Sequence, residues 1–462
     1  MPVPRLLIIG LDCAEPALVE RWRAELPHLN ALMERGVSGR LESCVPAITV
    51  PAWSCMLSGR DPGELGIYGF RGRADRSYAA MVVADGRAVR LPRLWDYLGA
   101  AGWRVAVIGV PGTYPPPGVN GVAVSCFLAP SIADGYTHPP DLAQRIAAWL
   151  ERPYLLDVPD FRSEDKSRIL ADIYTLCDQR FALAHRLLAE ERPDFLMLVD
   201  MGADRVHHAF WKHMDPVHPD YVPDSPFHHA IFDFYRHVDR RIGVLLAACD
   251  PDTAVLVVSD HGARPLMGGF RLNQWLLEHD YLALRERPAA PVAFDPAMVD
   301  WARTRAWGAG GYYGRIFLNV RGREPQGRIA PSDYDAERAA LAAALTNLPG
   351  PDGASLGNRV FTPQQLYRKV RGVAPDLLLY VGDLAWRAIG TVGGAGLFTR
   401  ENDTGPDDAN HAQHGLFIFY DPARPGAGRR LEGATIYDVL PTLLARYGIA
   451  APNDLRGSVL AW

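Results

Sequence analysis

Short apolar runs recur along the chain, and stretches with helical spacing separate them. Four of these runs predict buried strands, at residues 6–10, 105–109, 195–199 and 254–258. The stretches at 91–102 and 168–190 have apolar residues three and four positions apart, which predicts helices. Alternating strands and helices are typical of an α/β fold with a doubly wound, mostly parallel sheet flanked by helices.

The pattern is less regular between residues 265 and 400. Proline- and glycine-rich breaks fall at 288–291, 308–314 and 349–357. Apolar spacing returns at 415–420 and 434–447, which predicts a last strand and helix of the core. We therefore expect an α/β core over residues 1–264 and 401–462, with an inserted cap region over residues 265–400.

Composition and charge narrow the classes of partner. The 462 residues are 48% hydrophobic and 22% charged, as in an ordinary globular protein. Lys and Arg number 48 against 53 Asp and Glu, which gives a net charge of −5. This balance argues against a broad basic surface for a nucleic acid polymer. The sequence carries no signature of an oligomeric state.

The first residues of the chain and the cysteines indicate where in the cell the protein is expected. The apolar run at 6–10 is too short for a membrane span, and Asp12 interrupts it before a secretory signal could form. The six cysteines are scattered without a C-x-x-C pair, so we expect them to be reduced and mostly buried. Together these features predict a cytoplasmic protein that does not contact a membrane.

Polar residues follow three of the predicted strands. Asp12 follows the first strand, the stretch 200–208 follows the strand at 195–199, and Asp260 with His261 follows the strand at 254–258. In doubly wound sheets, chemistry gathers beyond the carboxyl ends of the strands. We expect these groups to converge on one edge of the sheet.

A hydroxyl group lies at a predicted helix start. Within residues 46–59, Thr49 is near the N-cap, Pro51 is in the first turn and Gly59 is at the stop. A hydroxyl there faces free backbone N–H groups and the positive end of the helix dipole, which suits a phosphate or a nucleophile. A simple capping threonine is the plainer alternative.

Asp204 and His208 are four residues apart, so one helical face presents both. Such pairs bind zinc readily, although a solvated surface pair is the alternative. His207 competes with His208, but it points about 100° away around the helix. His411 precedes the last predicted strand, where an ordinary loop histidine is the alternative.

These residues gain meaning as one ordered set. Three carboxylates, three imidazoles and one hydroxyl are enough to hold two divalent metal ions around a nucleophile. The set is Asp12, Thr49, Asp204, His208, Asp260, His261 and His411. A shared site explains all seven better than seven unrelated reasons.

The chain resembles the type I phosphodiesterase/nucleotide pyrophosphatase family of the alkaline phosphatase superfamily. Besides the ordered set, the matching motifs cover nearly the whole chain, at 10–12, 49–53, 58–62, 66–70, 259–262, 273–276, 321–325, 375–377, 411–415 and 437–442. The resemblance implies an alkaline-phosphatase-like fold and a site with two divalent ions, for which zinc is favoured. Manganese is the alternative, because mixed oxygen and nitrogen ligands admit both.

The resemblance also implies a division of the ligands. Asp12, Asp260 and His261 would hold one ion next to Thr49, which is both ligand and nucleophile, whereas Asp204, His208 and His411 would hold the other. Two departures exist. Cys13 stands where relatives often carry glycine, and His414 offers a second imidazole near His411. Either histidine remains open as the last ligand, and the spacing to Gly415 favours His411.

The implied activity is metal-dependent hydrolysis of small phosphate diesters or pyrophosphates, either nucleotide-like or with an activated headgroup or sugar. It would proceed through a phosphothreonine, with net retention at phosphorus. Alternatives on the same scaffold are a phosphomonoesterase, a phosphonate hydrolase or a phosphomutase. A sulfatase is disfavoured because residues 49–53 do not resemble C-x-P-x-R. A non-catalytic metal- or ligand-binding protein is the alternative from another class.

Several further side chains could contact a substrate, but the sequence does not separate this role from ordinary solvation or packing. They are Arg205, Arg264, Arg315, Arg323, Trp307, Tyr312 and Tyr313.

Overall fold

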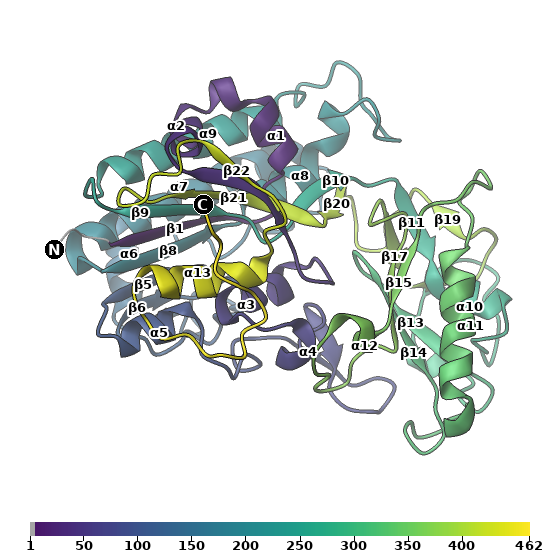
Figure 1. Cartoon of the computed structure of the whole chain (residues 1–462). Coiled ribbons are helices and arrows are strands. Elements are labelled where there is room, and N and C mark those ends of the chain that lie inside the picture. The colour runs from purple at the N-terminus through teal and green to yellow at the C-terminus, as the bar shows by residue number, and fades with distance from the viewer. Residues whose placement is uncertain (1–4) are drawn as a thin grey trace.

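The computed structural model describes residues 5–462, so residues 1–4 of the N-terminal stretch considered above lie outside it. A nine-stranded sheet forms the centre of the larger lobe (Figure 1). Its strands, in order across the sheet, are β22 (Arg429–Leu431), β2 (Val37–Glu42), β21 (His414–Tyr420), β9 (Ala254–Val258), β1 (Leu6–Leu11), β8 (Phe195–Asp200), β5 (Val105–Ile108), β6 (Gly121–Val124) and β7 (Thr137–His138).

The middle of this sheet is parallel. β1 pairs in parallel with β8 and β9, and Leu6 lies opposite Phe195 on one side and Ala254 on the other. β5 pairs in parallel with β8 and β6. The four predicted strands are therefore neighbours, and each is an unbroken apolar run because both of its faces are buried. The predicted α/β fold with a mostly parallel sheet is confirmed.

The edges of the sheet differ from its middle. β21 contains the predicted last strand, but it runs antiparallel to β9, with Phe417 opposite Val258. β2 then pairs antiparallel with β21, and β7 pairs antiparallel with β6. Strand direction cannot be obtained from apolar spacing, which is the same for both directions.

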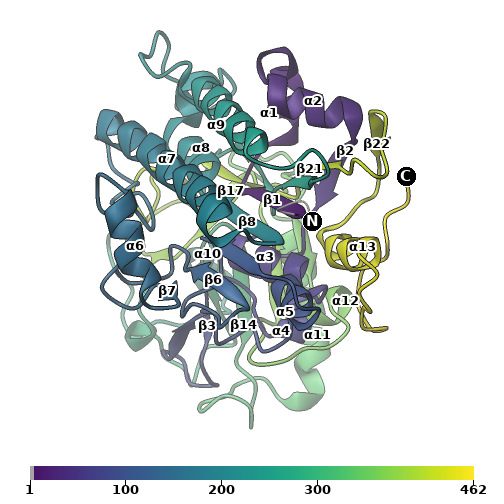
Figure 2. The ribbon, with the colours of Figure 1, turned by 90° about the vertical axis from the view of Figure 1, so that its left-hand side faces the viewer.

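Helices cover both faces of the sheet (Figures 1 and 2). One layer holds α2 (Pro27–Arg35), α7 (Lys166–Glu191), α8 (Gly202–Met214) and α9 (Ala230–Ala247), and the other holds α3 (Thr49–Ser58), α5 (Leu94–Ala100) and α13 (Val439–Arg446). Further helices are α1 (Pro16–Arg21), α4 (Pro62–Leu65) and α6 (Leu142–Trp149).

The predicted helices form close to their expected bounds. The stretch 168–190 lies within α7, which begins where the side chain of Asp165 accepts a hydrogen bond from the backbone N–H of Arg168. The stretch 91–102 contains the shorter helix α5, and a 3-10 turn at Ile436–Asp438 leads into α13.

A smaller lobe lies beside the sheet (Figure 1). Its strands form three sheets, β13-β14-β16-β15, β17-β11-β19 and β12-β18. Their bounds are β11 (Gly268–Arg271), β12 (Val292–Ala293), β13 (Ala306–Ala309), β14 (Gly314–Leu318), β15 (Arg359–Phe361), β16 (Leu377–Tyr380), β17 (Trp386–Ile389), β18 (Thr391–Val392) and β19 (Phe398–Thr399). The helices are α10 (Leu272–Glu278), α11 (Tyr334–Thr346) and α12 (Pro363–Leu366).

This lobe has an apolar cluster of its own, in which Phe270, Trp275 and Trp307 pack with strand residues of β14 and β16. The elements fall within or close to the stretch 265–400. That this stretch works as a cap over a catalytic core stays a prediction.

Two short ribbons lie outside these sheets. β10 (Gly262–Pro265) pairs antiparallel with β20 (Ala409–Ala412), which puts Ala263 opposite His411. β3 (Arg71–Arg73) pairs antiparallel with β4 (Met81–Val83). The first ribbon matters for the site, because it brings His411, which is distant in sequence, close to the end of β9.

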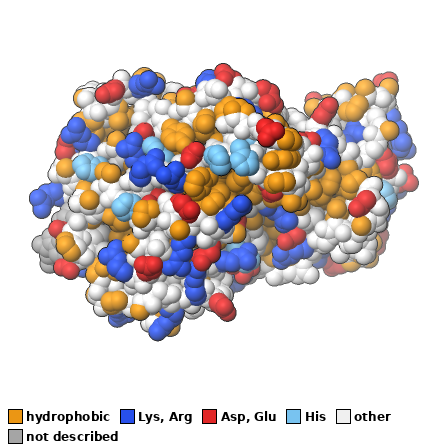
Figure 3. Space-filling view, turned by 90° about the horizontal axis from the view of Figure 1, so that it is seen from above, with side chains coloured by type: hydrophobic (Ala, Val, Ile, Leu, Met, Phe, Trp, Pro, Cys, Tyr) orange, Lys and Arg blue, Asp and Glu red, His pale blue; other side chains and the backbone are white. Residues whose placement is uncertain are grey.

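The surface charges and the state of the cysteines match what the composition suggests. Basic and acidic side chains lie interspersed on the face shown in Figure 3. Five of the six cysteines are buried and Cys249 is partly buried, all as free thiols. Within residues 5–462, no helix combines the length and apolar character needed to cross a bilayer.

Candidate active site

The seven residues of the ordered set meet at one edge of the sheet. Asp12 directly follows β1, Asp204 lies in the first turn of α8 just after β8, and Asp260 and His261 follow β9. The carboxyl ends of neighbouring parallel strands share an edge, which explains the convergence. β20 brings in His411 and the start of α3 brings in Thr49. All seven side chains are buried, and none is more than 2% exposed.

Thr49 is the first residue of α3. Ile48 occupies the N-cap in an extended conformation, and Gly59 ends the helix with φ 65°. The prediction put Thr49 near the N-cap, and the structure puts it one position inside. Its Oγ1 lies 3.3 Å from Nε2 of His261. The hydroxyl is thus held at a helix N-terminus, where backbone N–H groups without helical partners favour negative charge.

Asp12, Asp260 and His261 form one compact group, with ligand atoms all within 4.8 Å of one another. Nε2 of His261 lies 3.1 Å from Oδ2 of Asp260 and 3.9 Å from Oδ1 of Asp12. The other carboxylate oxygens are fixed by hydrogen bonds. Trp53 Nε1 donates to Asp12 Oδ2 (2.7 Å), and the backbone N–H of Cys13 donates to Asp260 Oδ1 (3.2 Å).

Asp204, His208 and His411 form the second group. His208 Nε2 lies 3.2 Å from Asp204 Oδ1, and His411 Nε2 lies 3.9 Å from the same oxygen. The rings of His411 and His261 stack with centroids 3.8 Å apart and an angle of 16°. This stacking places the two groups side by side.

All three histidines use their Nδ1 atoms outside the cluster. Nδ1 lies 3.1 Å from the carbonyl oxygen of Gly262 for His261, 2.8 Å from that of Ala47 for His411, and 2.5 Å from Oδ1 of Asp407 for His208. An Nδ1–H donating in this way leaves Nε2 with its lone pair. Metal-ligating histidines typically have this arrangement.

In the group of Asp12, Asp260 and His261, the electrostatics favour a bound cation. Burial raises the pKa of Asp12 well above its usual range, and repulsion from Asp204 adds to the effect. Burial likewise raises the pKa of Asp260, with Asp12 adding repulsion. Burial lowers the pKa of His261 to about 4, so this imidazole is neutral near pH 7. A divalent cation would favour the ionised carboxylates and use the neutral imidazole as a ligand.

The residues fit two divalent ions. Asp12 Oδ1, Asp260 Oδ2 and His208 Nε2 are buried without a hydrogen-bond partner, which is costly unless something else pairs with them. Carboxylate oxygens and imidazole nitrogens in two adjacent groups suit zinc or manganese. The ligand roles themselves stay predictions.

Asp407 is a residue that the sequence reasoning missed. Its side chain is buried, and besides His208 it contacts two arginines: Arg387 Nη1 donates to its Oδ2 (2.8 Å), and Arg162 Nη2 lies 3.3 Å from the same oxygen. A carboxylate at this distance favours a proton on Nδ1 of His208, and this contact directs Nε2 into the cluster. No periodic pattern marks it, and the only sequence signal is its position four residues before His411.

The structure separates residues that the sequence left open. His414 points elsewhere, with its Nδ1 3.3 Å from Arg40. His207 is directed to Tyr235, whose hydroxyl lies 3.2 Å from Nε2. Cys13 adopts φ 63°, and its Sγ lies within 4.8 Å of ligand atoms of Asp204 and His208.

Of the residues that could contact a substrate, three lie away from the site. Arg264 is bound to the carbonyl of Asp383, Arg323 pairs with Asp376, and Trp307 packs in the smaller lobe. Tyr313 packs beside Tyr380 and also lines the cavity beside Thr49. Tyr312 instead covers the histidines, with ring centroids 4.2 Å from His411 and 5.1 Å from His208.

A cavity of about 430 Å³ opens beside Thr49, within the usual size range for small-molecule sites. Phe70, Phe127 and Phe161 form apolar walls, and Arg205 and Arg315 are among the charged residues.

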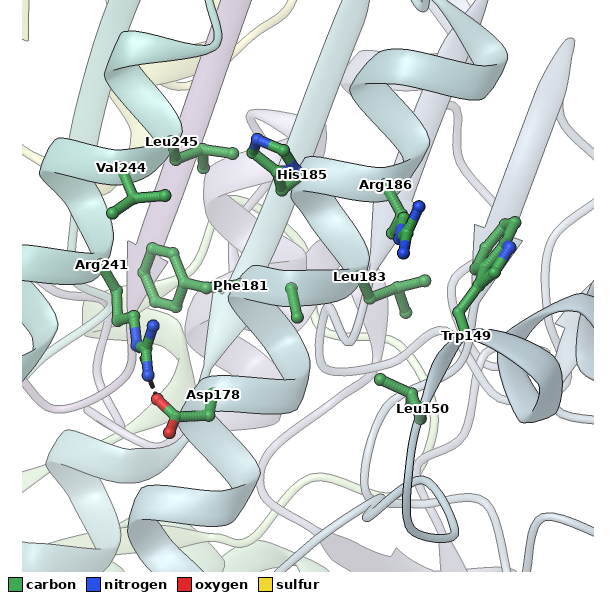
Figure 4. Close-up of a pocket in the computed structure, with 11 residues that line it drawn as sticks. Trp149, Leu150, Asp178, Phe181, Leu183, His185, Arg186, Arg241, Val244 and Leu245 are labelled. Carbon is green, nitrogen blue, oxygen red and sulfur yellow. Dashed lines mark hydrogen bonds and ion pairs between the residues drawn. The ribbon is translucent and has the colours of Figure 1, made fainter.

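A different cavity, between α6, α7 and α9, is shown in Figure 4. Trp149 and Phe181 form its walls, and its carboxylate, Asp178, already accepts hydrogen bonds from Arg241 (2.7 Å) and His237 (2.5 Å). The residues that line it include none of the ordered set. The cavity beside Thr49 is therefore the candidate active site.

Comparison with known families agrees with this geometry. The family model described as "Type I phosphodiesterase / nucleotide pyrophosphatase" matches residues 6–416. The chain belongs to this family. The family is metal-dependent and its members are enzymes, so this chain is assigned as an enzyme and the alternative of a non-catalytic binding protein is set aside.

Solved structures share the fold. Phosphonoacetate hydrolase from Sinorhizobium meliloti 1021, in complex with phosphonoformate, superposes with a TM-score of 0.59 at 20% identity, over 95% of this chain and 97% of that one. Human ectonucleotide pyrophosphatase / phosphodiesterase 5 gives 0.57 at 15% identity, over 98% and 97%. An inactive variant of the murine protein, in complex with AMP, gives 0.56 at 14% identity, over the same shares. At these identities the likeness concerns the fold alone.

Proposed function

We propose that this protein hydrolyses small phosphate diesters or pyrophosphates, nucleotide-like or with an activated headgroup or sugar, through a phosphothreonine on Thr49. The observation that carries the proposal is the position of the Thr49 hydroxyl. It lies at the N-terminus of α3, 3.3 Å from His261, beside two groups of ligand-type side chains and at the wall of a cavity.

Asp12, Asp260 and His261 would hold one divalent ion, and Asp204, His208 and His411 the other. Zinc is our first choice and manganese the second. When bound, such ions would stabilise negative charge on the Thr49 oxygen and on the phosphoryl oxygens. Two features of the chain support the ligand roles: the Nδ1 contacts, which leave the three Nε2 atoms facing the cluster, and the unpartnered carboxylate oxygens.

Thr49 Oγ1 gives its proton to solvent and attacks phosphorus, and the bond between phosphorus and the first leaving group breaks on the opposite side. Water then attacks the phosphothreonine and regenerates the hydroxyl. Backbone N–H groups at the start of α3 favour the charge that develops on the phosphoryl oxygens. Each displacement inverts the configuration at phosphorus, so the complete reaction retains it.

The proposal includes a cytoplasmic location without membrane contact. It is supported by the place of the first apolar run, which forms the buried central strand β1.

The test compares bis-p-nitrophenyl phosphate with p-nitrophenyl phosphate, using metal-stripped protein reloaded with zinc or with manganese. The proposal expects metal-dependent turnover and preference for the diester. Preference for the monoester would move the assignment to a phosphomonoesterase or phosphomutase. Inactivity on both esters, with release of phosphate from a phosphonate, would move it to a phosphonate hydrolase.

A further inference from the structure

The active-site cavity carries more positive than negative charge. Its lining includes five arginines and two carboxylates. The arginines are Arg71, Arg162, Arg205, Arg315 and Arg387, and the carboxylates are Asp157 and Asp204. If Asp204 serves a metal ion, the excess becomes larger. Pairing within the cavity shows which of these guanidinium groups remain available.

Arg205 is fully engaged. Its Nε donates to Asp157 Oδ1 (2.8 Å) and its Nη2 to Asp157 Oδ2 (2.6 Å), while Nη1 contacts Asp204. Such a two-point pair with one carboxylate satisfies the guanidinium plane. Arg205 therefore has no donor group left for an additional anion.

Arg162 and Arg387 share a single carboxylate. Both contact Oδ2 of Asp407, whose Oδ1 is bound to His208. Arg387 is only 4% exposed, and its Nε has no hydrogen-bond partner; Nε of Arg162 also lacks one. One carboxylate thus serves two arginines and an imidazole, and the positive charge of the pair is not neutralised.

Arg315 has no carboxylate partner within the described chain. It reaches from β14 of the smaller lobe and donates to the backbone carbonyls of Arg71 and Gly310, the latter at 3.3 Å. Its Nε is buried without a partner. The charge of a half-buried guanidinium held only by carbonyl oxygens is uncompensated, and an anionic group would pair with it favourably.

We infer that Arg315, with Arg162 and Arg387, forms a subsite for a second anionic group of the substrate. This inference rests on the proposed function, in which the scissile phosphate lies at Thr49. Phe70, Phe127 and Phe161 supply apolar surface in the same cavity and suit an organic arm between the two charges. The substrate class is then a small phosphate ester or phosphonate whose organic part ends in a carboxylate or a phosphate.

The test uses three diesters with the same leaving group: the carboxymethyl, phosphonomethyl and carbamoylmethyl esters of p-nitrophenyl phosphate. The first two carry the second anion and the third is a neutral isostere of the first. Wild-type enzyme should have kcat/KM at least ~10-fold higher for one of the anionic esters than for the neutral one, because charge-assisted pairing discriminates by about that factor. The better of the two shows whether the subsite takes carboxylate or phosphate.

Arg315→Gln removes the unpaired charge. It should lower kcat/KM for the preferred anionic ester by ~10-fold more than for the carbamoylmethyl ester, mainly through KM. Arg315→Lys should restore part of the preference. Arg303→Gln is the matched control, because Arg303 also belongs to the smaller lobe, its side chain is 75% exposed and it does not line the cavity. This control should behave as wild type.

Equal kcat/KM for charged and neutral esters in wild-type enzyme would overturn the subsite while leaving the proposed function intact. An equal loss for all three esters in Arg315→Gln would also overturn it. If wild type cleaves none of the esters, the proposed function fails, and calorimetry on metal-loaded protein decides the inference separately. Phosphonoacetate should then bind at least ~10-fold more tightly than phosphonoacetamide, and Arg315→Gln should remove the difference; equal binding would refute it.

Discussion

Replacing Asp407 tests how the site holds its second group of ligands. The carboxylate is buried, and its Oδ1 lies 2.5 Å from Nδ1 of His208. Because this contact fixes the proton on Nδ1 and the orientation of Nε2, its loss should weaken the ion held by Asp204, His208 and His411. Comparable partners of ligating histidines change metal affinity by about 10–100-fold, or roughly 1.4–2.7 kcal/mol.

The two substitutions at this position should differ. Asp407→Asn keeps an oxygen acceptor but loses the charge, so we expect a loss near ~10-fold. Asp407→Ala removes the acceptor and leaves Arg387 without its carboxylate, so we expect a loss near ~100-fold together with a lower Tm. The ion held by Asp12, Asp260 and His261 should be bound as in wild type.

The assay is zinc competition against a chromophoric chelator, with elemental analysis of bound metal. Asp408→Asn serves as the control, because this neighbouring buried carboxylate pairs with Lys212 (3.4 Å) instead of His208. Two tightly bound ions in Asp407→Ala would refute the reasoning. An equal loss of affinity in Asp408→Asn would also refute it, since the effect would then be a general disturbance of the loop.

Three further predictions follow from the same site and from the helices behind it. Thr49→Ala should retain both ions, since six ligand groups remain, but lose turnover by orders of magnitude. Elemental analysis and steady-state kinetics on one preparation check this. Near-normal turnover would exclude Thr49 as the nucleophile. Asp260→Asn and treatment of wild type with EDTA should both remove metal and lower the Tm, because bound metal stabilises the folded state; an unchanged melting curve after verified loss of metal would contradict this. Asp178 has its pKa lowered, because hydrogen bonds from His237 and Arg241 outweigh partial burial, so its stabilising effect is present above pH ~4 and is lost as the pH falls through the lower folded-state pKa. The Tm difference between wild type and Asp178→Asn should therefore shrink on acidification towards pH 2, and a difference that grows would show the opposite sign of linkage.

Much of the fold could be predicted because the central strands are buried on both faces. Such strands appear as unbroken apolar runs, as at β1 and β9, and helical spacing marks α7 just as clearly. The antiparallel direction of β21 could not be predicted from the sequence, because strand direction depends on how the chain returns to the sheet. The smaller lobe was visible only as irregular spacing, since its strands are short and its sheets small.

The candidate site was predictable to the extent that its residues follow strands or share a helical face. Asp12, Asp260 and the pair Asp204 and His208 satisfy these rules. His411 could be predicted only from the order of the whole set of seven residues, because β20 reaches the site through its pairing with β10. The structure puts it in the cluster and puts His414 outside.

The surroundings of the site could not be predicted. Asp407 lies in a loop 199 residues from His208, and Arg315 approaches from a strand of the smaller lobe. Local spacing carries no information about such contacts, because they depend on how two lobes are placed together. Arg205 and Arg315 are both arginines beside polar or glycine residues in sequence, yet one is neutralised by Asp157 and the other is not.

The central claim is that Thr49 becomes phosphorylated during turnover. The most direct measurement is the stereochemical course of hydrolysis of a diester that carries a chiral phosphorothioate, performed in isotopically labelled water. Two successive displacements predict net retention of configuration at phosphorus. Net inversion would mean that water attacks the substrate in a single step, and it would contradict the covalent route through Thr49.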